Sequence, residues 1–244
     1  MSRSAEYTFQ VQHMDVGFRE SIRFAKLGAY LLHTAGLNAN ENGFGIDVLH
    51  AEQRAWVLSR FAVEMTQYPK SGDFFSVETW IQDFGRIFTT RNFCVRDASR
   101  NAIGGGSSIW CMIDMESRKA VDLRSKQEYE GFATGIPSPI DKPIKVIVPQ
   151  AEPTSRHRIK YSDIDFNRHT NSMKYLEWML DLFPMSVYQN QQVKRMDINY
   201  VNEAVFGDTV DICRINPDLD RYVFGLKRGD DSICNAQLMF ENVI

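Results

Sequence analysis

The feature that most constrains the fold of this chain is an internal repeat, because its two halves resemble each other on either side of a proline-rich stretch. Five of the eight prolines fall between residues 137 and 153, where each removes a backbone hydrogen-bond donor and favours extended backbone. On either side of this stretch, residues 13–19 resemble residues 161–167, which lie 148 positions later. The pattern predicts two diverged copies of one folding unit joined by a linker.

The offset between matching positions decreases along the chain. Gly72-Asp73 matches Gly207-Asp208 at an offset of 135, and residues 91–103 match residues 221–233 at an offset of 130. A longer loop in the first half, around Asn38 to Gly45, would account for the larger change. We therefore predict three segments: a first unit at residues 1–135, a linker at residues 136–154 and a second unit at residues 155–244.

Each copy predicts one long helix followed by several strands, which is an α+β arrangement. The helices, about Ser21–Ala35 and about Asn171–Phe183, are apolar on most sides, so other elements must wrap around each of them. Alternating apolar residues such as Met196, Ile198 and Tyr200 indicate an antiparallel sheet with one buried face. A long helix cradled by an antiparallel sheet, twice over, resembles a double hot-dog fold.

Composition argues against several classes of protein. The formal net charge is −3 and no run of five like charges occurs, so nucleic-acid binding is not expected. The chain has neither an 18-residue apolar run nor a signal-peptide pattern, so we expect a cytoplasmic protein without a membrane segment. The four cysteines are far apart and lack ligand spacing, so neither a disulfide framework nor a metal site is predicted.

The densest polar cluster lies between strand and helix of the second copy and contains Asp165, Asn167 and His169. In an extended segment, these alternating side chains would project to one side. An imidazole can move a proton near neutral pH, a carboxylate can orient it, and an amide can donate to a polarised oxygen. The N-terminus of the following helix would add free amide donors. The combination suggests acyl transfer.

A turn followed by a helix cap is the alternative interpretation of this cluster, because Asp, Asn and Thr are favoured there for local hydrogen bonding. The first copy serves as an internal control. It has Gly17 opposite Asp165, Arg19 opposite Asn167, and no histidine opposite His169. Since the fold does not need the cluster, the comparison favours a functional role and places the site in the second half.

The motif Asp-x-Asn-x-His-x-Asn at residues 165–171, followed by Tyr175-Leu-Glu-Trp178, resembles the core motif of the acyl-ACP thioesterases of plants and bacteria. The resemblance extends over nearly the whole chain. Because most plant members carry an N-terminal targeting extension that is lacking here, the chain looks like the bacterial form. The resemblance implies hydrolysis of fatty acyl-ACP to a free fatty acid, with acyl carrier protein as partner and no metal or organic cofactor.

The resemblance also implies catalytic roles for Asp165, Asn167 and His169, and for a later glutamate that Glu203 fits; by itself, Glu203 would be read as a surface carboxylate. Plant enzymes have cysteine after this glutamate, whereas this chain has Ala204. A thiol nucleophile is thus excluded there, and attack by water or by a carboxylate is favoured. We expect Glu203 to act as general base on water, or alternatively as nucleophile, with His169 positioned by Asp165 and sharing the proton transfer.

Further expectations concern the acyl chain and the partner. The first unit is predicted to house the acyl chain, with Trp56, Phe18 and Met65 as wall residues or else as ordinary core. Acyl carrier protein is acidic, and six basic residues would form either a docking patch or a solvated face: Arg156, Arg158, Lys160, Arg168, Lys194 and Arg195. We expect a monomer or homodimer. Two other functions remain open, a hydratase or dehydratase that keeps the thioester and a non-catalytic acyl-thioester-binding protein.

Overall fold

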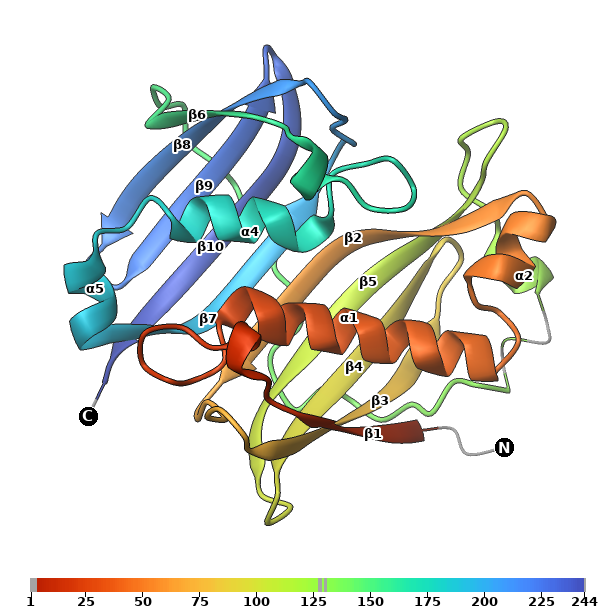
Figure 1. The fold of residues 1–244 in the computed structure, drawn as a ribbon. Coiled ribbons are helices and arrows are strands. Elements are labelled where there is room, and N and C mark those ends of the chain that lie inside the picture. Colours follow the sequence, from red (N-terminus) through yellow and green to blue (C-terminus); the bar gives the residue numbers. More distant parts are fainter. Residues whose placement is uncertain (1–3, 127–128, 130, 244) are drawn as a thin grey trace. The chain divides into compact units, whose positions relative to one another are not determined.

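The computed structural model describes residues 4–126, 129 and 131–243, and it divides the chain into two units, Met1–Pro143 and Ile144–Ile244 (Figure 1). The predicted units include residues 1–3 and 244, which lie outside this described part. The division falls within the stretch predicted as a linker. Within the described residues, no helix is long and apolar enough to cross a membrane.

The first unit consists of an antiparallel sheet with one long helix lying across a face (Figure 1). Its strands follow the spatial order β1-β3-β4-β5-β2. The strands are β1 (Ser4–Gln10), β2 (Arg54–Met65), β3 (Phe74–Phe84), β4 (Phe88–Asp97) and β5 (Ala102–Asp114). The helices are α1 (Phe24–Glu41), α2 (Ile46–Ala51) and two 3-10 turns, His13–Asp15 and Leu123–Ser125.

The second unit repeats this arrangement with a shorter helix. Its antiparallel strands follow the order β7-β10-β9-β8-β6. The strands are β6 (Ser155–Arg158), β7 (Gln191–Tyr200), β8 (Thr209–Asp218), β9 (Arg221–Arg228) and β10 (Asp231–Asn242). The helices are α4 (Ser172–Leu180), α5 (Met185–Asn190) and a 3-10 turn, Tyr161–Asp163.

Helix α1 packs closely on its sheet because small residues allow the approach. Leu27 and Leu31 of α1 are fully buried. A Cβ atom added to Gly106 on β5 would lie 2.7 Å from the Cδ2 atom of Leu31, which is far closer than side-chain atoms normally approach. The run Gly104-Gly-Gly106 is therefore a closely packed strand, and Gly106 fixes the depth at which α1 sits.

The helix boundaries differ from the prediction at both helices. Helix α1 continues to Glu41, so the first half gains its extra length in a longer helix and in α2, whereas the prediction placed a loop at residues 38–45. Helix α4 ends at Leu180, although the apolar pattern extends to Phe183. Phe183 is buried against Tyr222, at 4.7 Å between ring centroids, so its apolar character comes from packing beyond the helix.

The proline-rich stretch forms a strap along each sheet. In the first unit, the carbonyl oxygen of Ile136 accepts a hydrogen bond of 2.9 Å from the indole of Trp80. In the second unit, Asp197 and Asn199 on β7 accept hydrogen bonds from the backbone amides of Ile144 and Val146, at 3.1 and 2.7 Å. The segment predicted as a linker thus also satisfies polar side chains of both sheets.

The repeat read from the sequence recurs in the backbone hydrogen bonds of the two units. At an offset of 148, Arg23 donates to the carbonyl of Asp15 and Asn171 donates to that of Asp163, at 2.9 and 2.8 Å. The amide of Ile22 donates to the carbonyl of Pro69 at 2.9 Å, and the amide of Thr170 donates to that of Ala204 at 2.8 Å. The two donors differ by 148 positions and the two acceptors by 135. These matching bonds allow a position-by-position comparison of the unit that has the polar cluster with the unit that lacks it.

Candidate active site

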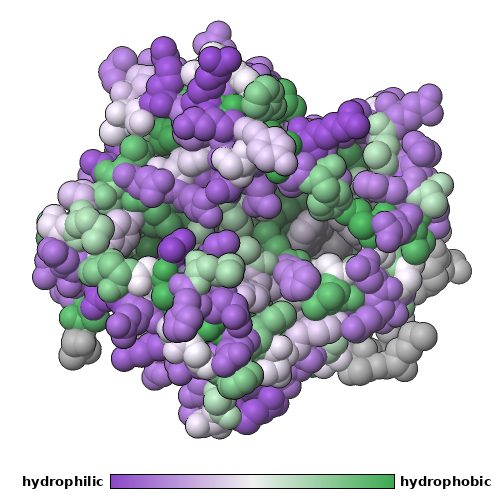
Figure 2. Space-filling model, viewed as in Figure 1, coloured by the Kyte–Doolittle hydropathy of each residue, from purple (hydrophilic) through white to green (hydrophobic). Residues whose placement is uncertain are grey.

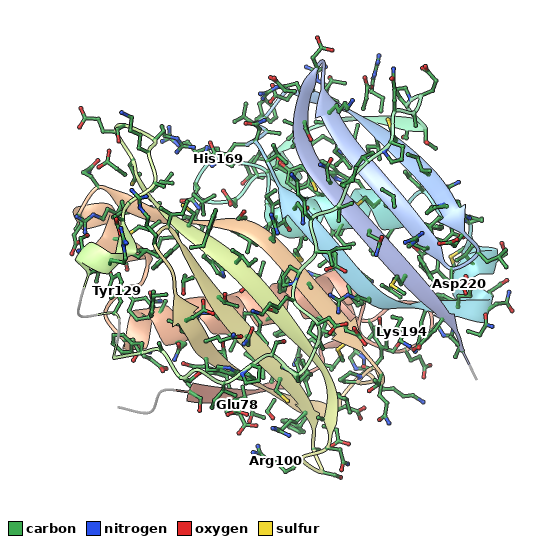
Figure 3. All side chains as sticks on the ribbon, turned by 180° about the vertical axis from the view of Figure 1, so that it is seen from behind. Glu78, Arg100, Tyr129, His169, Lys194 and Asp220 are labelled. Carbon is green, nitrogen blue, oxygen red and sulfur yellow. The ribbon has the colours of Figure 1, made fainter. Side chains whose placement is uncertain are left out.

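The polar cluster lies on a tight loop between the 3-10 turn Tyr161–Asp163 and helix α4 (Figure 3). The backbone amide of Asp165 donates to the carbonyl of His169 at 2.8 Å, and Arg168 adopts a positive φ of 67° to close the loop. The segment is therefore a turn, whereas the argument for convergent side chains assumed extended backbone. A positive φ at a residue other than glycine is uncommon and marks this loop as locally strained.

Glu203 meets His169 at the end of this loop. The Nε2 atom of His169 lies 3.4 Å from the Oε2 atom of Glu203, so the two form an ion pair when the imidazole is protonated. About a third of each side chain is exposed, 34% for His169 and 39% for Glu203. Because both groups remain accessible, a substrate and a water molecule can reach the pair.

The backbone brings these two residues together by joining their loops. His169 forms an antiparallel bridge with Val205. The amide of the following residue, Thr170, donates to the carbonyl of Ala204 at 2.8 Å. On the second loop, Arg228 donates to the Asp208 carboxylate at 2.6 Å, and that carboxylate accepts the Val205 amide at 3.1 Å. The contact between His169 and Glu203 thus rests on main-chain geometry.

Asp165 contacts the main chain of its own loop. Its Oδ1 atom accepts hydrogen bonds from the backbone amides of Asn167 and His169, at 2.9 and 3.2 Å. We expected this carboxylate to orient or charge the imidazole. The described hydrogen bonds join its Oδ1 atom to the main chain of the loop that carries the imidazole, while Glu203 lies against the ring. A catalytic role of Asp165 stays a prediction.

The first turn of α4 offers fewer free amides than expected. Asn171 is the N-cap residue, and its Oδ1 atom accepts the Met173 amide at 2.9 Å. Its carbonyl oxygen accepts the Lys174 amide at the same distance. Because these donors are already used, the start of α4 has fewer free amides for a negatively charged substrate oxygen than we expected.

Two residues to which the sequence analysis gave no role, Asp163 and His157, lie next to the loop that carries the site. Asp163 is buried, and its Oδ2 atom accepts the Lys160 amide at 2.8 Å and lies 3.1 Å from Nε2 of His157. His157 stacks on Trp178 with 4.0 Å between ring centroids. Burial opposes ionisation of Asp163, but the hydrogen bonds from Lys160 and His157 hold its pKa below the usual range. Asp15 occupies the matching position of the first unit, 148 residues earlier, and is also buried. The presence of an acid at this position in both copies was the signal that could have revealed Asp163.

The position that holds cysteine in plant enzymes is Ala204 in this chain, and the thiol of the buried Cys234 is unsuited to act as nucleophile. Ala204 is fully buried, so a side chain at that position points into the unit. Cys234 pairs with Tyr200 in the sheet, and burial raises the pKa of its thiol far above the usual range. Among the residues that the structure describes, no group of three or more histidine, cysteine, aspartate or glutamate residues could hold a metal ion.

The six basic residues of the predicted docking patch differ in their surroundings, and docking by them stays a prediction. Arg195 is buried, and its guanidinium pairs with the Asp197 carboxylate at 2.8 Å, so it cannot meet a partner. Arg156 pairs with Asp211 and Lys194 with Glu241, at 2.6 and 3.8 Å. Three members stay exposed on or next to the loop that carries the site: Arg158, Lys160 and Arg168.

Two exposed aromatic residues, Tyr161 and Phe166, lie close in sequence to these basic residues. The visible surface is largely hydrophilic with separate hydrophobic patches (Figure 2). Tyr161 is 87% exposed and Phe166 is 73% exposed, although both are large and partly apolar. Aromatic residues and arginine are enriched in interfaces between proteins, whereas lysine is depleted there.

The predicted wall residues of the first unit occupy three different environments. Phe18 is exposed on its loop, and Met65 is buried at the end of β2. Trp56 packs against an apolar cluster formed by six buried residues. The cluster consists of Phe44, Leu49, Ile81, Met112, Leu123 and Tyr129. A role in binding the acyl chain stays a prediction for all three wall residues, and Trp56 is the one whose surroundings favour it.

Two family models match the chain, the acyl-ACP thioesterase N-terminal domain over residues 3–128 and the acyl-ACP thioesterase C-terminal domain over residues 149–242. The oleoyl-acyl carrier protein thioesterase of Coriandrum sativum is 26% identical over 230 residues, which cover 87% of this chain and 62% of the relative. The palmitoyl-acyl carrier protein thioesterase of Arabidopsis thaliana is 26% identical over 180 residues, 70% of this chain and 43% of the relative. The chain thus spans less than two thirds of the length of these curated relatives.

Solved structures show the same fold. An acyl-ACP thioesterase from Bacteroides thetaiotaomicron superposes with a TM-score of 0.93 at 35% identity, covering 99% of this chain and 100% of the other. The 12:0-ACP thioesterase from Umbellularia californica gives a TM-score of 0.85 at 18% identity, covering 100% and 99%. The α+β double hot-dog fold predicted from the sequence is confirmed.

Proposed function

This chain belongs to the acyl-ACP thioesterase family, and from that premise we propose that it hydrolyses fatty acyl-ACP to a free fatty acid and acyl carrier protein. The observation that carries the proposal is the contact between the Nε2 atom of His169 and the Oε2 atom of Glu203, at 3.4 Å. A carboxylate and an imidazole at this separation, both reachable from solvent, can accept a proton from one oxygen and deliver it to a leaving sulfur.

In the proposed reaction, Glu203 removes a proton from a water molecule as the water oxygen attacks the thioester carbonyl carbon. The protonated imidazole of His169 then donates a proton to the sulfur as the carbon–sulfur bond breaks, and the proton that Glu203 took from water passes to His169, which restores the pair. The products are a fatty acid and the free thiol of the carrier. Such general acid and base help contributes typically about 10²- to 10⁴-fold to a rate.

Asn167 has the donor group suited to the carbonyl oxygen, which gains negative charge during attack. An oxyanion donor is worth on the order of 10²- to 10³-fold in rate. The occupied amides of Met173 and Lys174 increase the dependence on this side chain. The alternative in which Glu203 attacks the carbonyl itself would give a mixed anhydride, which water would then hydrolyse.

The test is release of free thiol from acyl-ACP and acyl-CoA substrates by the wild type, His169→Ala and Glu203→Ala. We expect loss of about 10²-fold or more in kcat from each variant. His13→Ala is the matched control, because His13 lies on the equivalent 3-10 turn of the first unit and should keep full activity. A wild type that binds the thioester without cleaving it would contradict the hydrolase. If the acyl chain is changed chemically while the thioester bond stays intact, the result would instead indicate hydratase or dehydratase chemistry.

A further inference from the structure

Next to the paired residues, the second unit has hydroxyl groups at positions where the first unit has apolar side chains. Thr170 and Tyr175 are buried, with 6% and 4% of their surfaces exposed, and their repeat counterparts are Ile22 and Leu27. Tyr200 is half-buried at the end of β7, and its counterpart is Met65. Since the same backbone is built in the first unit without these hydroxyl groups, the fold does not require them.

The first hydroxyl contact joins the residues that directly follow the pair. The Oγ1 atom of Thr170 donates to the carbonyl oxygen of Ala204 at 3.0 Å, in addition to the backbone hydrogen bond of 2.8 Å to the same oxygen. Thr170 follows His169 and Ala204 follows Glu203. Tyr175 lies near Tyr200, with 6.2 Å between the ring centroids. In the first unit, Ile22 makes only the backbone bond to Pro69.

The second hydroxyl contact joins the strand before Glu203 to the helix after His169. Tyr200 donates from its phenol to the carbonyl oxygen of Ser172 at 3.1 Å. Tyr200 ends the strand that leads to Glu203, and Ser172 begins the helix that follows His169. The two contacts therefore attach the chain before and after Glu203 to the residues that directly follow His169.

Such groups are costly to bury. A hydroxyl removed from water loses free energy unless it finds a partner, and an apolar side chain would avoid that cost. Burial also raises the pKa of Tyr175 and Tyr200 far above the usual range, so both phenols stay protonated and remain donors. The second unit accepts this cost at positions where the first unit has apolar side chains, which indicates a use for these hydroxyl groups other than folding.

We propose that Thr170 and Tyr200 are positioning residues that hold His169 against Glu203 for the reaction. The inference rests on the proposed function. The pair belongs to two separate loops, and the hydroxyl contacts limit how far these loops can move apart. Misplacement of a reacting group by about 1 Å can cost on the order of 10²-fold in rate, so small movements matter.

The kinetic test uses Thr170→Val and Tyr200→Phe, which remove one hydroxyl each and keep the shape of the side chain. We expect kcat for acyl-ACP to fall about 10-fold or more while KM changes less than about 2-fold, because the variants disturb the reacting pair and not substrate binding. Thr170→Ser keeps the donor and should restore most of kcat. Tyr30→Phe is the matched control, since it removes a phenol that donates to Asp15 at 2.8 Å in the first unit.

A second measurement does not depend on turnover. The imidazole resonances of His169, assigned by their loss in His169→Ala, should move in Glu203→Gln and move in the same direction in Thr170→Val and Tyr200→Phe. If the wild type cleaves no thioester, the proposed function fails, and these resonances still test the positioning role. Wild-type resonances and wild-type kcat in the hydroxyl variants would overturn the inference. So would Glu203→Gln leaving the His169 resonances unmoved, because the contact would then be absent in solution.

Discussion

The carboxylate of Asp165 accepts a hydrogen bond from the backbone amide of His169 at 3.2 Å, so it holds the main chain of the residue whose ring lies against Glu203. Asparagine at position 165 would keep an Oδ1 acceptor for this amide and for that of Asn167. We therefore expect Asp165→Asn to retain kcat within about 10-fold, and Asp165→Ala to lose about 10²-fold. Steady-state hydrolysis of acyl-ACP measures both.

The same pair of variants separates positioning from charge. If Asp165→Asn is as damaged as Asp165→Ala, a negative charge near the imidazole is required, and the expectation from sequence that Asp165 acts on the ring would be correct. Thermal unfolding of both variants is the control, since a loop that no longer folds would lower Tm along with kcat.

Asp163 predicts a pH dependence of stability. Its pKa in the folded protein lies below the ordinary value of 3.8, because hydrogen bonds from Lys160 and His157 outweigh the effect of burial. A carboxyl with a lowered folded pKa contributes stability that is present above the unfolded pKa and lost as the pH falls through the folded pKa. Asp163→Asn should thus reduce the loss of stability between about pH 5 and pH 2. Urea unfolding across that range measures it.

At neutral pH, the same substitution should destabilise the protein by about 1–3 kcal/mol, because it weakens buried hydrogen bonds to a charged group. Asp220→Asn is the matched control, since Asp220 is exposed in the turn between β8 and β9 (Figure 3). If Asp163→Asn and Asp220→Asn give the same acid profile, Asp163 makes no special contribution.

The sequence predicted the fold well because the fold is repeated. The drifting offsets, the apolar helices and the alternating strands all describe one unit twice, and each copy supports the interpretation of the other. The errors lie at helix ends, where the continuation of α1 to Glu41 and the burial of Phe183 depend on packing partners that are distant in sequence. Periodicity alone carries no information about those partners.

The site was less predictable from sequence than the fold. Glu203 was assigned through the family resemblance, and only the folded chain brings its carboxylate beside His169. The bonds of Asp165 to backbone amides and the stack of His157 on Trp178 could not be read from residue types, because both depend on loop geometry. The side-chain pairing of Arg195 was hidden for the same reason.

The exposed basic residues Arg158, Lys160 and Arg168 predict a dependence on the carrier. Changing each to alanine should raise KM for acyl-ACP several-fold and reduce its salt dependence, because rim charges act mainly on association with an acidic partner. KM for acyl-CoA, which has no protein surface, should change less. Lys119→Ala, an exposed cation in a turn of the first unit, is the control. Equal effects on both substrates would contradict docking of the carrier by these residues.

Arg195 should behave differently from those three residues. Its guanidinium donates two hydrogen bonds to the buried Asp197 carboxylate, at 2.8 and 3.1 Å. Removing one partner of a buried ion pair leaves an uncompensated charge and costs about 3–5 kcal/mol. We expect Arg195→Ala to lower the free energy of unfolding by that amount, measured in urea, with KM for acyl-ACP unchanged at temperatures where the variant stays folded.

Two glycines of the first unit predict opposite effects on stability. Gly106→Ala on β5 would place a Cβ atom 2.7 Å from Leu31 of α1, so helix and sheet must separate, at a cost of about 1–3 kcal/mol. Gly36 lies within α1, and a Cβ atom there meets nothing within 4 Å. Gly36→Ala should stabilise the protein by about 0.5–1 kcal/mol through its higher helix propensity. Urea unfolding of both variants decides whether glycine sets the depth of α1, since equal effects would show that it does not.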